Sequence, residues 1–142
     1  MNKNGVVILV EDDRDDQGLI LEIVKDLNIK NEILLFENGL EAYTYLNNNN
    51  KDPFLIISDI NMPLMSGTEF RDKMQKEGEL RLRSVPFLFL TTGVAPDNII
   101  NAYAHSVQDF FTKRPSYEQM KRTFFKIFEY WSECAEPLFR SK

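Results

Sequence analysis

The chain has 142 residues, a formal net charge of −5, 43% hydrophobic residues and 27% charged residues, a composition that is typical of a globular protein and excludes a disordered or fibrous chain. The length predicts one domain, residues 1–142, with no separate output domain. The acidic balance and the scattered Lys and Arg residues argue against nonspecific binding to nucleic acid, which needs clustered positive charge.

Two features of the sequence concern the cellular compartment. The first apolar run, residues 6–10, is too short for a signal-peptide core or a membrane span. Cys134 is the single cysteine, which excludes an intramolecular disulfide and fits a reducing compartment. We therefore expect a cytoplasmic protein that does not contact a membrane.

Five short apolar runs alternate with helical patterns along the chain. This alternation is typical of repeated β-α units and predicts a doubly wound α/β fold, a parallel sheet with helices on both faces. The first run has five consecutive aliphatic residues and is expected in the centre of the sheet. The expected strands are residues 6–10, 33–36, 54–58, 87–90 and 109–112.

The helices are predicted from apolar residues that recur at spacings of three and four. In the helix after the first strand, Asp15 or Asp16 is available as N-terminal cap and first-turn charge. The helix after the third strand carries Phe70 and extends toward Leu80, and charged residues such as Arg71 are expected on its solvated face.

The last helix has the longest amphipathic pattern in the chain. Phe125 and Tyr130 lie off its apolar stripe, which predicts exposed aromatic surface. Residues 132–142 are expected to pack partially or to fray. The apolar stripe consists of Tyr117, Met120, Phe124, Ile127, Phe128 and Trp131.

Carboxylates follow two of the predicted strands. The apolar residues 54–57 deliver Asp59 to the open end of a buried strand, where its side chain is available for chemistry. Pro63 and Gly67 prevent the strand or a helix from continuing directly, so a loop forms beyond the carboxylate. Residues 11–13, Glu-Asp-Asp, follow the first strand in the same way. Two strands that end in carboxylates predict one shared site.

These features occur in a fixed order. The acidic residues 11–13 follow the first strand, Asp59-Ile60-Asn61-Met62-Pro63 with Gly67 follows the third, Thr91 follows the fourth and Lys113 follows the fifth. In this order and spacing they resemble the receiver domain of bacterial two-component response regulators.

The resemblance covers roughly residues 5–131 and leaves residues 132–142 as a C-terminal extension. It implies the flavodoxin-like receiver fold, a doubly wound five-stranded parallel sheet with strand order 2-1-3-4-5. In open parallel sheets, ligands bind outside the carboxyl ends of the strands, where the order of the chain reverses. All the matched residues are expected at that edge.

The acidic residues predict a metal site. Carboxylates within a few ångström of one another repel, and a cation must offset the repulsion. Mg²⁺ prefers hard oxygen ligands and is commonly held by one or two carboxylates and phosphate oxygens. The resemblance implies that Asp12 and Asp59 bind Mg²⁺ directly, Glu11 through a water molecule and Asn61 through its backbone carbonyl. A second register, with Asp12 and Asp13 as the acidic pair, stays open, although the pair directly after the strand is favoured.

The resemblance also implies the chemistry. Asp59 would accept a phosphoryl group from a phosphohistidine of a histidine kinase or a histidine phosphotransfer protein. Lys113 would pair with one phosphoryl oxygen, and the Thr91 hydroxyl would donate a hydrogen bond to another. Thr91 and Phe110 would form the switch that couples phosphorylation to a protein-binding surface. The expected function is that of a single-domain response regulator, which is no enzyme beyond its own phosphorylation and dephosphorylation and which signals to a downstream protein that the sequence does not name.

Two positions depart from the usual receiver sequence. Arg114 stands between Lys113 and Pro115, whereas in most receivers the proline follows the lysine directly, so a cis peptide bond would lie between Arg114 and Pro115. Thr92 occupies a position that is usually Ala or Gly, and we expect it to narrow access to the phosphoryl group. His105, the single histidine, is expected on a helix surface and not as a phosphodonor or ligand.

The sequence is also compatible with other functions and with an assembly. A receiver-like interaction module that is not phosphorylated stays open, and a magnesium-dependent phosphohydrolase is disfavoured because Asn61 replaces the second Asp that would serve as acid and base. Phe125 and Tyr130, with the C-terminal extension, are expected to form a homodimer or partner contact. Residues 128–131, Phe-Glu-Tyr-Trp, are similar to the ending of stand-alone receivers associated with bacterial phytochromes, which pair on that side.

Overall fold

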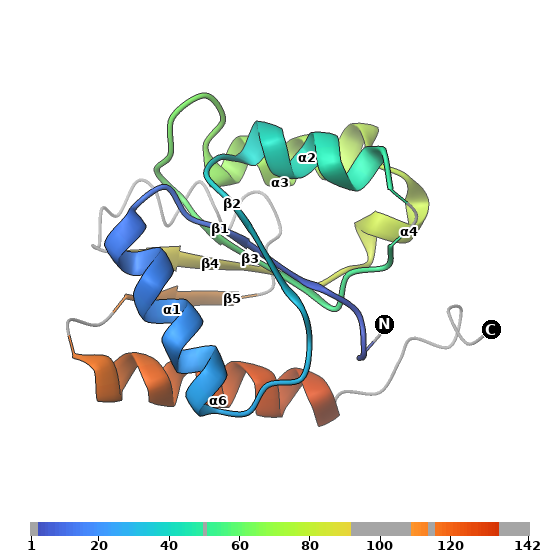
Figure 1. Cartoon of the computed structure of the whole chain (residues 1–142). Helices are drawn as coiled ribbons and strands as arrows, with labels where there is room; N and C mark the ends of the chain where they lie inside the picture. The colour runs from blue at the N-terminus through green and yellow to red at the C-terminus, as the bar shows by residue number, and fades with distance from the viewer. Residues whose placement is uncertain (1–2, 50, 92–108, 114–115, 134–142) are drawn as a thin grey trace.

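The strands form one parallel five-stranded sheet. The structure, a computed structural model, describes residues 3–49, 51–91, 109–113 and 116–133. The strand order is β2-β1-β3-β4-β5, and every neighbouring pair is parallel (Figure 1). The predicted fold class and strand order are therefore confirmed. The strands are β1 (Val7–Val10), β2 (Ile33–Phe36), β3 (Leu55–Asp59), β4 (Phe87–Thr91) and β5 (Asp109–Thr112).

Helices cover both faces of the sheet. In Figure 1, α1 (Arg14–Asp26) and α6 (Tyr117–Glu133) lie below the sheet, and α2 (Gly39–Asn47) and α3 (Gly67–Glu77) lie above it. The short α4 (Leu80–Arg83) follows α3. The sheet is thus the middle of three layers, as right-handed β-α-β connections to both faces require.

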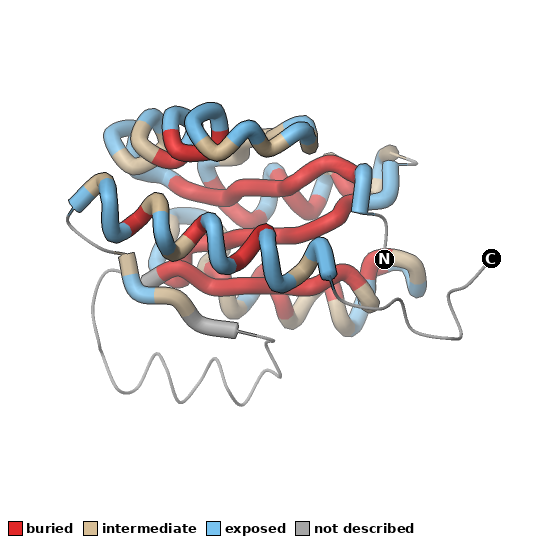
Figure 2. The backbone as a smooth tube through the Cα atoms, turned by 90° about the horizontal axis from the view of Figure 1, so that it is seen from below, coloured by how far each residue is buried: buried red, intermediate tan, exposed pale blue. Residues whose placement is uncertain are grey.

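Two apolar clusters fill the spaces between the layers. Alternate residues of a strand point to opposite faces of a sheet, so Val7 and Leu9 pack toward α1 and α6, whereas Ile8 and Val10 pack toward α2 and α3. In Figure 2 the buried residues run continuously along the inner strands, while the helices alternate between buried and exposed residues. The continuous aliphatic runs in the sequence are explained by burial on both faces.

The N-cap of the first helix lies upstream of the two residues that were expected to cap it. Asp13 is the N-cap of α1, and its side chain accepts hydrogen bonds from the backbone N–H groups of Asp15 and Asp16. The prediction that Asp15 or Asp16 provides the cap was therefore wrong. Both residues lie in the first turn, where the partial positive charge of the helix N-terminus favours a carboxylate.

The region after β3 differs from its prediction in two ways. Helix α3 ends at Glu77, so Leu80 belongs to the separate α4 and is 78% exposed. Arg71 is buried and does not lie on the solvated face. It follows Phe70 and precedes Met74 on the buried side of α3, and its guanidinium lies 5.7 Å from the centre of the Phe87 ring. A cationic group over an aromatic ring makes this burial tolerable.

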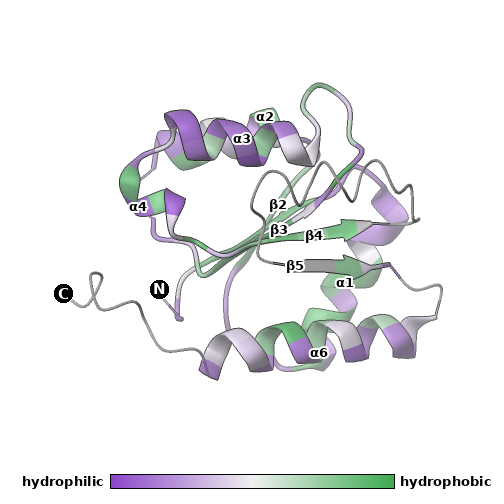
Figure 3. Ribbon diagram, turned by 180° about the vertical axis from the view of Figure 1, so that it is seen from behind, coloured by the Kyte–Doolittle hydropathy of each residue, from purple (hydrophilic) through white to green (hydrophobic). Residues whose placement is uncertain are grey.

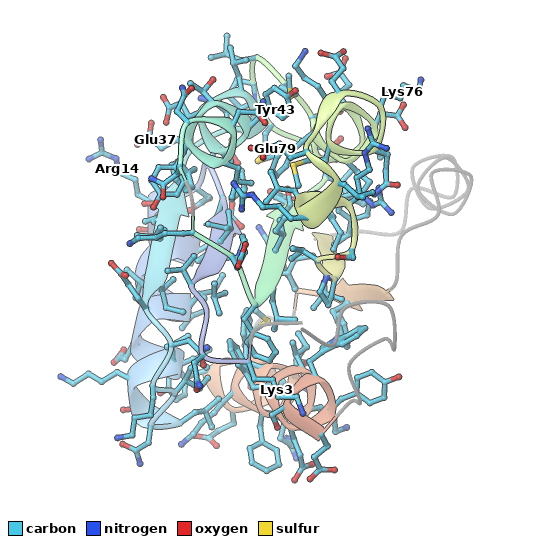
Figure 4. The ribbon with its side chains drawn as sticks, turned by 90° about the vertical axis from the view of Figure 1, so that its right-hand side faces the viewer. Lys3, Arg14, Glu37, Tyr43, Lys76 and Glu79 are labelled. Carbon is cyan, nitrogen blue, oxygen red and sulfur yellow. The ribbon has the colours of Figure 1, made fainter. Side chains whose placement is uncertain are left out.

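The surface and the last helix follow the predicted pattern. Figure 3 shows hydrophobic residues concentrated in the sheet and hydrophilic residues on the helices, and in Figure 4 Arg14 and Lys76 point away from the molecule. On α6, Phe125 and Tyr130 are 50% and 59% exposed, as their positions off the apolar stripe predicted. Within the described ranges, no helix is both long enough and apolar enough to span a membrane.

Candidate functional site

Three strands deliver polar side chains to one edge of the sheet. Glu11 follows β1, Asp59 is the last residue of β3, and Lys113 follows β5. Parallel strands end at the same edge, and β1 and β3 are direct neighbours, with Val10 opposite Ser58. The order of the chain reverses between β1 and β3, the position at which open parallel sheets bind ligands.

Three carboxylates meet at this edge. Glu11, Asp12 and Asp59 each offer one oxygen, and these oxygens all lie within 4.8 Å of one another. Glu11 is fully buried and Asp59 is 9% exposed, whereas Asp12 is exposed. The backbone fixes both buried groups: the N–H of Ile60 donates to Asp59 Oδ1 at 2.8 Å, and the N–H of Asp13 donates to Glu11 Oε2 at 3.1 Å.

One ammonium group lies among the carboxylates. Lys113 Nζ is 2.5 Å from Glu11 Oε1, 2.9 Å from Asp16 Oδ2 and 3.4 Å from Asp59 Oδ2. The lysine side chain is only 8% exposed. A single positive charge therefore serves three carboxylates from β1, β3 and α1.

Burial changes the protonation equilibria of the site. Loss of solvent raises the pKa of Glu11 to about 7, against the opposing effect of Lys113. Burial also raises the pKa of Asp59 above its usual range, and again the nearby Lys113 opposes the shift. Burial alone would lower the pKa of Lys113, but its contacts with Glu11 and Asp16 outweigh that effect and raise the pKa. The edge thus carries more negative charge than one lysine neutralises, which favours an added cation or a bound proton.

The carboxylates fit a divalent cation. Glu11 Oε1 is buried and, within the described part of the chain, accepts no hydrogen bond of good geometry, although Lys113 is close enough to form an ion pair. Hard carboxylate oxygens are the ligands that Mg²⁺ prefers. Asp13 was the alternative to Glu11 in the acidic pair, and its carboxylate is engaged in capping α1. Among the residues that the structure describes, the acidic group that could hold a metal is Glu11, Asp12 and Asp59.

The loop after β3 closes back onto Asp59. The N–H of Gly67 donates to the carbonyl of Ile60 at 2.7 Å. A Cβ atom at Gly67 would collide with the backbone carbonyl of Asp59 and would lie 3.0 Å from the Phe89 ring, so only glycine fits. Leu64, in the same loop, has φ 66°, the left-handed region that a leucine rarely adopts. Asn61 lies in this loop, exposed, two residues beyond Asp59.

Some predicted residues are only partly described. Thr91 is the last residue of β4 and pairs with Thr112, and Phe110 pairs with Phe89, so both lie on the strands expected for them. Their side chains lie outside the description, as do Thr92, His105, Arg114, Pro115 and Cys134.

Sequence reasoning missed two residues that complete the site. Asp16 was considered only as a helix cap or first-turn charge, but its carboxylate contacts Lys113. Gln17 had no assigned role, and its side-chain amide donates to the backbone carbonyl of Glu11 at 2.6 Å. Residues in the first turn of α1 lie next to the end of β1 because the connection is short, and that proximity was the available signal.

Comparisons with known proteins agree over nearly the whole chain. The sequence model of the response regulator receiver domain family matches residues 7–124. Response regulator Rcp1 of Synechocystis sp. is 28% identical over 137 residues, which are 93% of this chain and 92% of that protein. The crystal structure of the phosphorylated cyanobacterial phytochrome response regulator RcpA is similar with a TM-score of 0.83 and 28% identity, over 94% of this chain and 97% of that one. The Mn²⁺-bound form of response regulator Rcp1 gives a TM-score of 0.79 and 28% identity, over 93% and 97%.

Proposed function

Because the chain belongs to the family of response regulator receiver domains, we propose that it is a phosphorylation switch in which Asp59 accepts the phosphoryl group. Receiver domains of this family are signalling proteins of two-component systems and not enzymes that act on separate substrates. The observation that carries the assignment to Asp59 is its position: a buried carboxylate with Lys113 at 3.4 Å and further carboxylates within 4.8 Å.

The chemistry follows from this arrangement. A carboxylate oxygen of Asp59 forms a bond to phosphorus, the bond between phosphorus and the histidine nitrogen of the donor breaks, and its electron pair stays on the imidazole ring. The ammonium of Lys113 pairs with a phosphoryl oxygen, and Thr91 at the end of β4 donates its hydroxyl to another. The switch pair, Thr91 and Phe110, then changes the protein-binding surface. The donor is a histidine kinase or a histidine phosphotransfer protein.

Mg²⁺ is the proposed metal of this site. Glu11, Asp12, Asp59 and the backbone carbonyl of Asn61 would hold it. Support comes from Glu11 Oε1, which is buried and accepts no hydrogen bond within the described part of the chain, and from the Mn²⁺-bound form of Rcp1. When bound, the ion supplies positive charge that offsets the carboxylates and the incoming phosphoryl oxygens. The protein contributes the fixed positions of the oxygens.

The proposed output is a protein contact made by a single cytoplasmic domain, residues 1–142. A homodimer or partner contact through α6 is supported by Phe125 and Tyr130, which are 50% and 59% exposed. Tyr130 and Trp131 also line a pocket of about 220 Å³ between β5 and α6. Solution mass with and without beryllofluoride, a phosphoryl mimic, tests the dimer, and a monomer under both conditions rejects it.

Intact mass spectrometry tests the phosphorylation itself. After incubation with acetyl phosphate and Mg²⁺, the wild type should gain one phosphoryl group that hydroxylamine removes, as expected for an acyl phosphate. Asp59→Asn should gain none, whereas Asp15→Asn, a matched change on the exposed side of α1, should gain one. An unmodified wild type that binds a partner would indicate an interaction module. Continuous hydrolysis of excess acetyl phosphate would indicate a hydrolase.

A further inference from the structure

Asp16 accepts a hydrogen bond from Lys113 but lies outside the proposed metal-binding group. Its Oδ2 accepts a hydrogen bond from Lys113 Nζ at 2.9 Å, across 97 positions of sequence. In the described part of the chain, the carboxylates grouped closely enough to hold a cation are those of Glu11, Asp12 and Asp59. Asp16 therefore contacts the lysine of the site without belonging to that group of oxygens.

The position of Asp16 is fixed by the start of α1. The Asp13 side chain accepts a hydrogen bond from the Asp16 N–H at 3.1 Å. The next residue, Gln17, ties the helix to the end of β1 through its 2.6 Å hydrogen bond to the Glu11 carbonyl. The first turn of α1 is thus attached to the same strand end that supplies Glu11. These hydrogen bonds therefore fix the backbone of Asp16 beside Lys113.

The ammonium of Lys113 is already in contact with three carboxylates, so a phosphoryl group has to compete for it. An ammonium has three N–H donors, and three carboxylates already lie within 3.4 Å of Nζ. A phosphoryl group on Asp59 brings three strong acceptor oxygens. Pairing of the lysine with any of them therefore competes with its existing contacts.

Burial identifies the contact that is exchanged. Phosphorylation converts the Asp59 carboxylate into an acyl phosphate, so the carboxylates left to compete for Lys113 are those of Glu11 and Asp16. The Glu11 side chain is 1% exposed, and a buried carboxylate that loses its cation is left with a large desolvation cost. The Asp16 side chain is 32% exposed, so water can replace the lysine there. We propose that Asp16 holds Lys113 in the unphosphorylated protein and releases it to the phosphoryl group, so that Asp16 limits how readily Asp59 keeps a phosphoryl group. This inference rests on the proposed function of Asp59.

Affinity for beryllofluoride in the presence of Mg²⁺, measured by calorimetric titration, tests the inference. Asp16→Asn should bind the mimic roughly two- to fivefold more tightly than Asp15→Asn, the range expected for loss of one partly exposed ion pair. Asp15 lies one residue away in the same helical turn, is exposed, and loses the same charge on substitution. The comparison therefore removes the general effect of lowering negative charge near an anion.

Two more measurements separate release of Lys113 from a structural role. Asp16→Glu keeps a carboxylate in reach of the lysine and should restore the wild-type affinity for beryllofluoride. Affinity for Mg²⁺ alone should agree between Asp16→Asn and Asp15→Asn, because neither residue belongs to the proposed metal-binding group.

The outcomes are distinguishable. Equal beryllofluoride affinities in Asp16→Asn and Asp15→Asn, or weaker binding in Asp16→Asn, overturn the inference and leave the function of Asp59 intact. Failure of the wild type to bind beryllofluoride or to be phosphorylated overturns the proposed function, and the inference with it.

Discussion

Ile8 in the middle of β1 and Glu11 just beyond its end are equally inaccessible to solvent, but burial has opposite consequences for them. Ile8 belongs to an apolar cluster between the sheet and two helices, and its burial stabilises the fold. Glu11 loses its hydration at the carboxyl edge, where one lysine serves several carboxylates. The sheet interior therefore stabilises the fold. That stability offsets the cost of burying charged groups at the carboxyl edge, where they can bind a ligand.

The largest effect should come from the interior. Phe124→Ala removes a ring that is 1% exposed, and we expect it to lower the free energy of unfolding by about 3–5 kcal/mol. Phe125→Ala, its neighbour on α6, removes a ring that is 50% exposed and should cost less than about 1 kcal/mol. Chemical denaturation of the two variants measures the difference. Similar losses would show that α6 does not anchor the interior as described.

A smaller loss is expected where the interior meets the carboxyl edge. In Gly67→Ala the new methyl group collides with the Asp59 carbonyl, which should destabilise the protein by about 1–3 kcal/mol and displace the carboxylate. Gly18→Ala is the matched control, because a Cβ there meets nothing within 4 Å and the site lies within α1. It should stabilise the protein by about 0.5–1 kcal/mol. Opposite signs in thermal unfolding would support the close packing of the loop on Asp59, and equal signs would contradict it.

At the carboxyl edge, the affinity for Mg²⁺ should depend on pH. With a pKa of about 7, Glu11 is mostly protonated at lower pH and must lose its proton to bind a metal. Mg²⁺ affinity should therefore rise by about tenfold between pH 6 and pH 8, the change in the deprotonated fraction of such a group. Glu11→Gln should bind Mg²⁺ more weakly and with a shallower slope. An equally steep slope in Glu11→Gln would assign the proton to another group.

The same group affects stability without metal. The folded protein holds the Glu11 proton more tightly than the unfolded chain, whose ordinary pKa is 4.5. Since the folded state then binds more protons between these two values, the free energy of unfolding falls as the pH rises from about 5 through 7. Asp59, whose pKa is also raised, contributes in the same direction.

The smallest effect should have the opposite sign to the first. Asp59→Asn removes a charge from the crowded edge and keeps an oxygen for the N–H of Ile60, so the metal-free protein should gain about 0.5–1 kcal/mol. Asp15→Asn, at an exposed position, should change stability by less than about 0.5 kcal/mol. Both are measured by denaturation in the presence of a chelator. A destabilised Asp59→Asn would mean that Lys113 more than compensates for the carboxylate.

The sheet interior was predictable because its signal is local. Continuous aliphatic runs such as residues 54–57 indicate strands buried on both faces, and the spacing of Met120 and Phe124 indicates the buried side of a helix. Convergence of Glu11 and Asp59 could also be predicted, because parallel strands end at one edge. These inferences need only the order of the elements.

The remaining features depend on distant contacts. The pairing of Asp16 with Lys113 joins residues 97 positions apart, and nothing in the first turn of α1 distinguishes Asp16 from Asp15. Arg71 looked like a solvent-exposed charge because its burial depends on the Phe87 ring from another strand. Charged side chains with long-range partners carry little signal in the local sequence.

The position of Lys113 just after the last strand has a consequence for biosynthesis. Residues 11–16 and 59 leave the ribosome well before residue 113, so an early intermediate with only the first three strands would hold clustered acids without their cation. Such an intermediate gains little from assembling that edge. We expect the nascent chain to complete its native topology only after β5 has emerged, because Lys113 then pairs with the acidic residues of the edge.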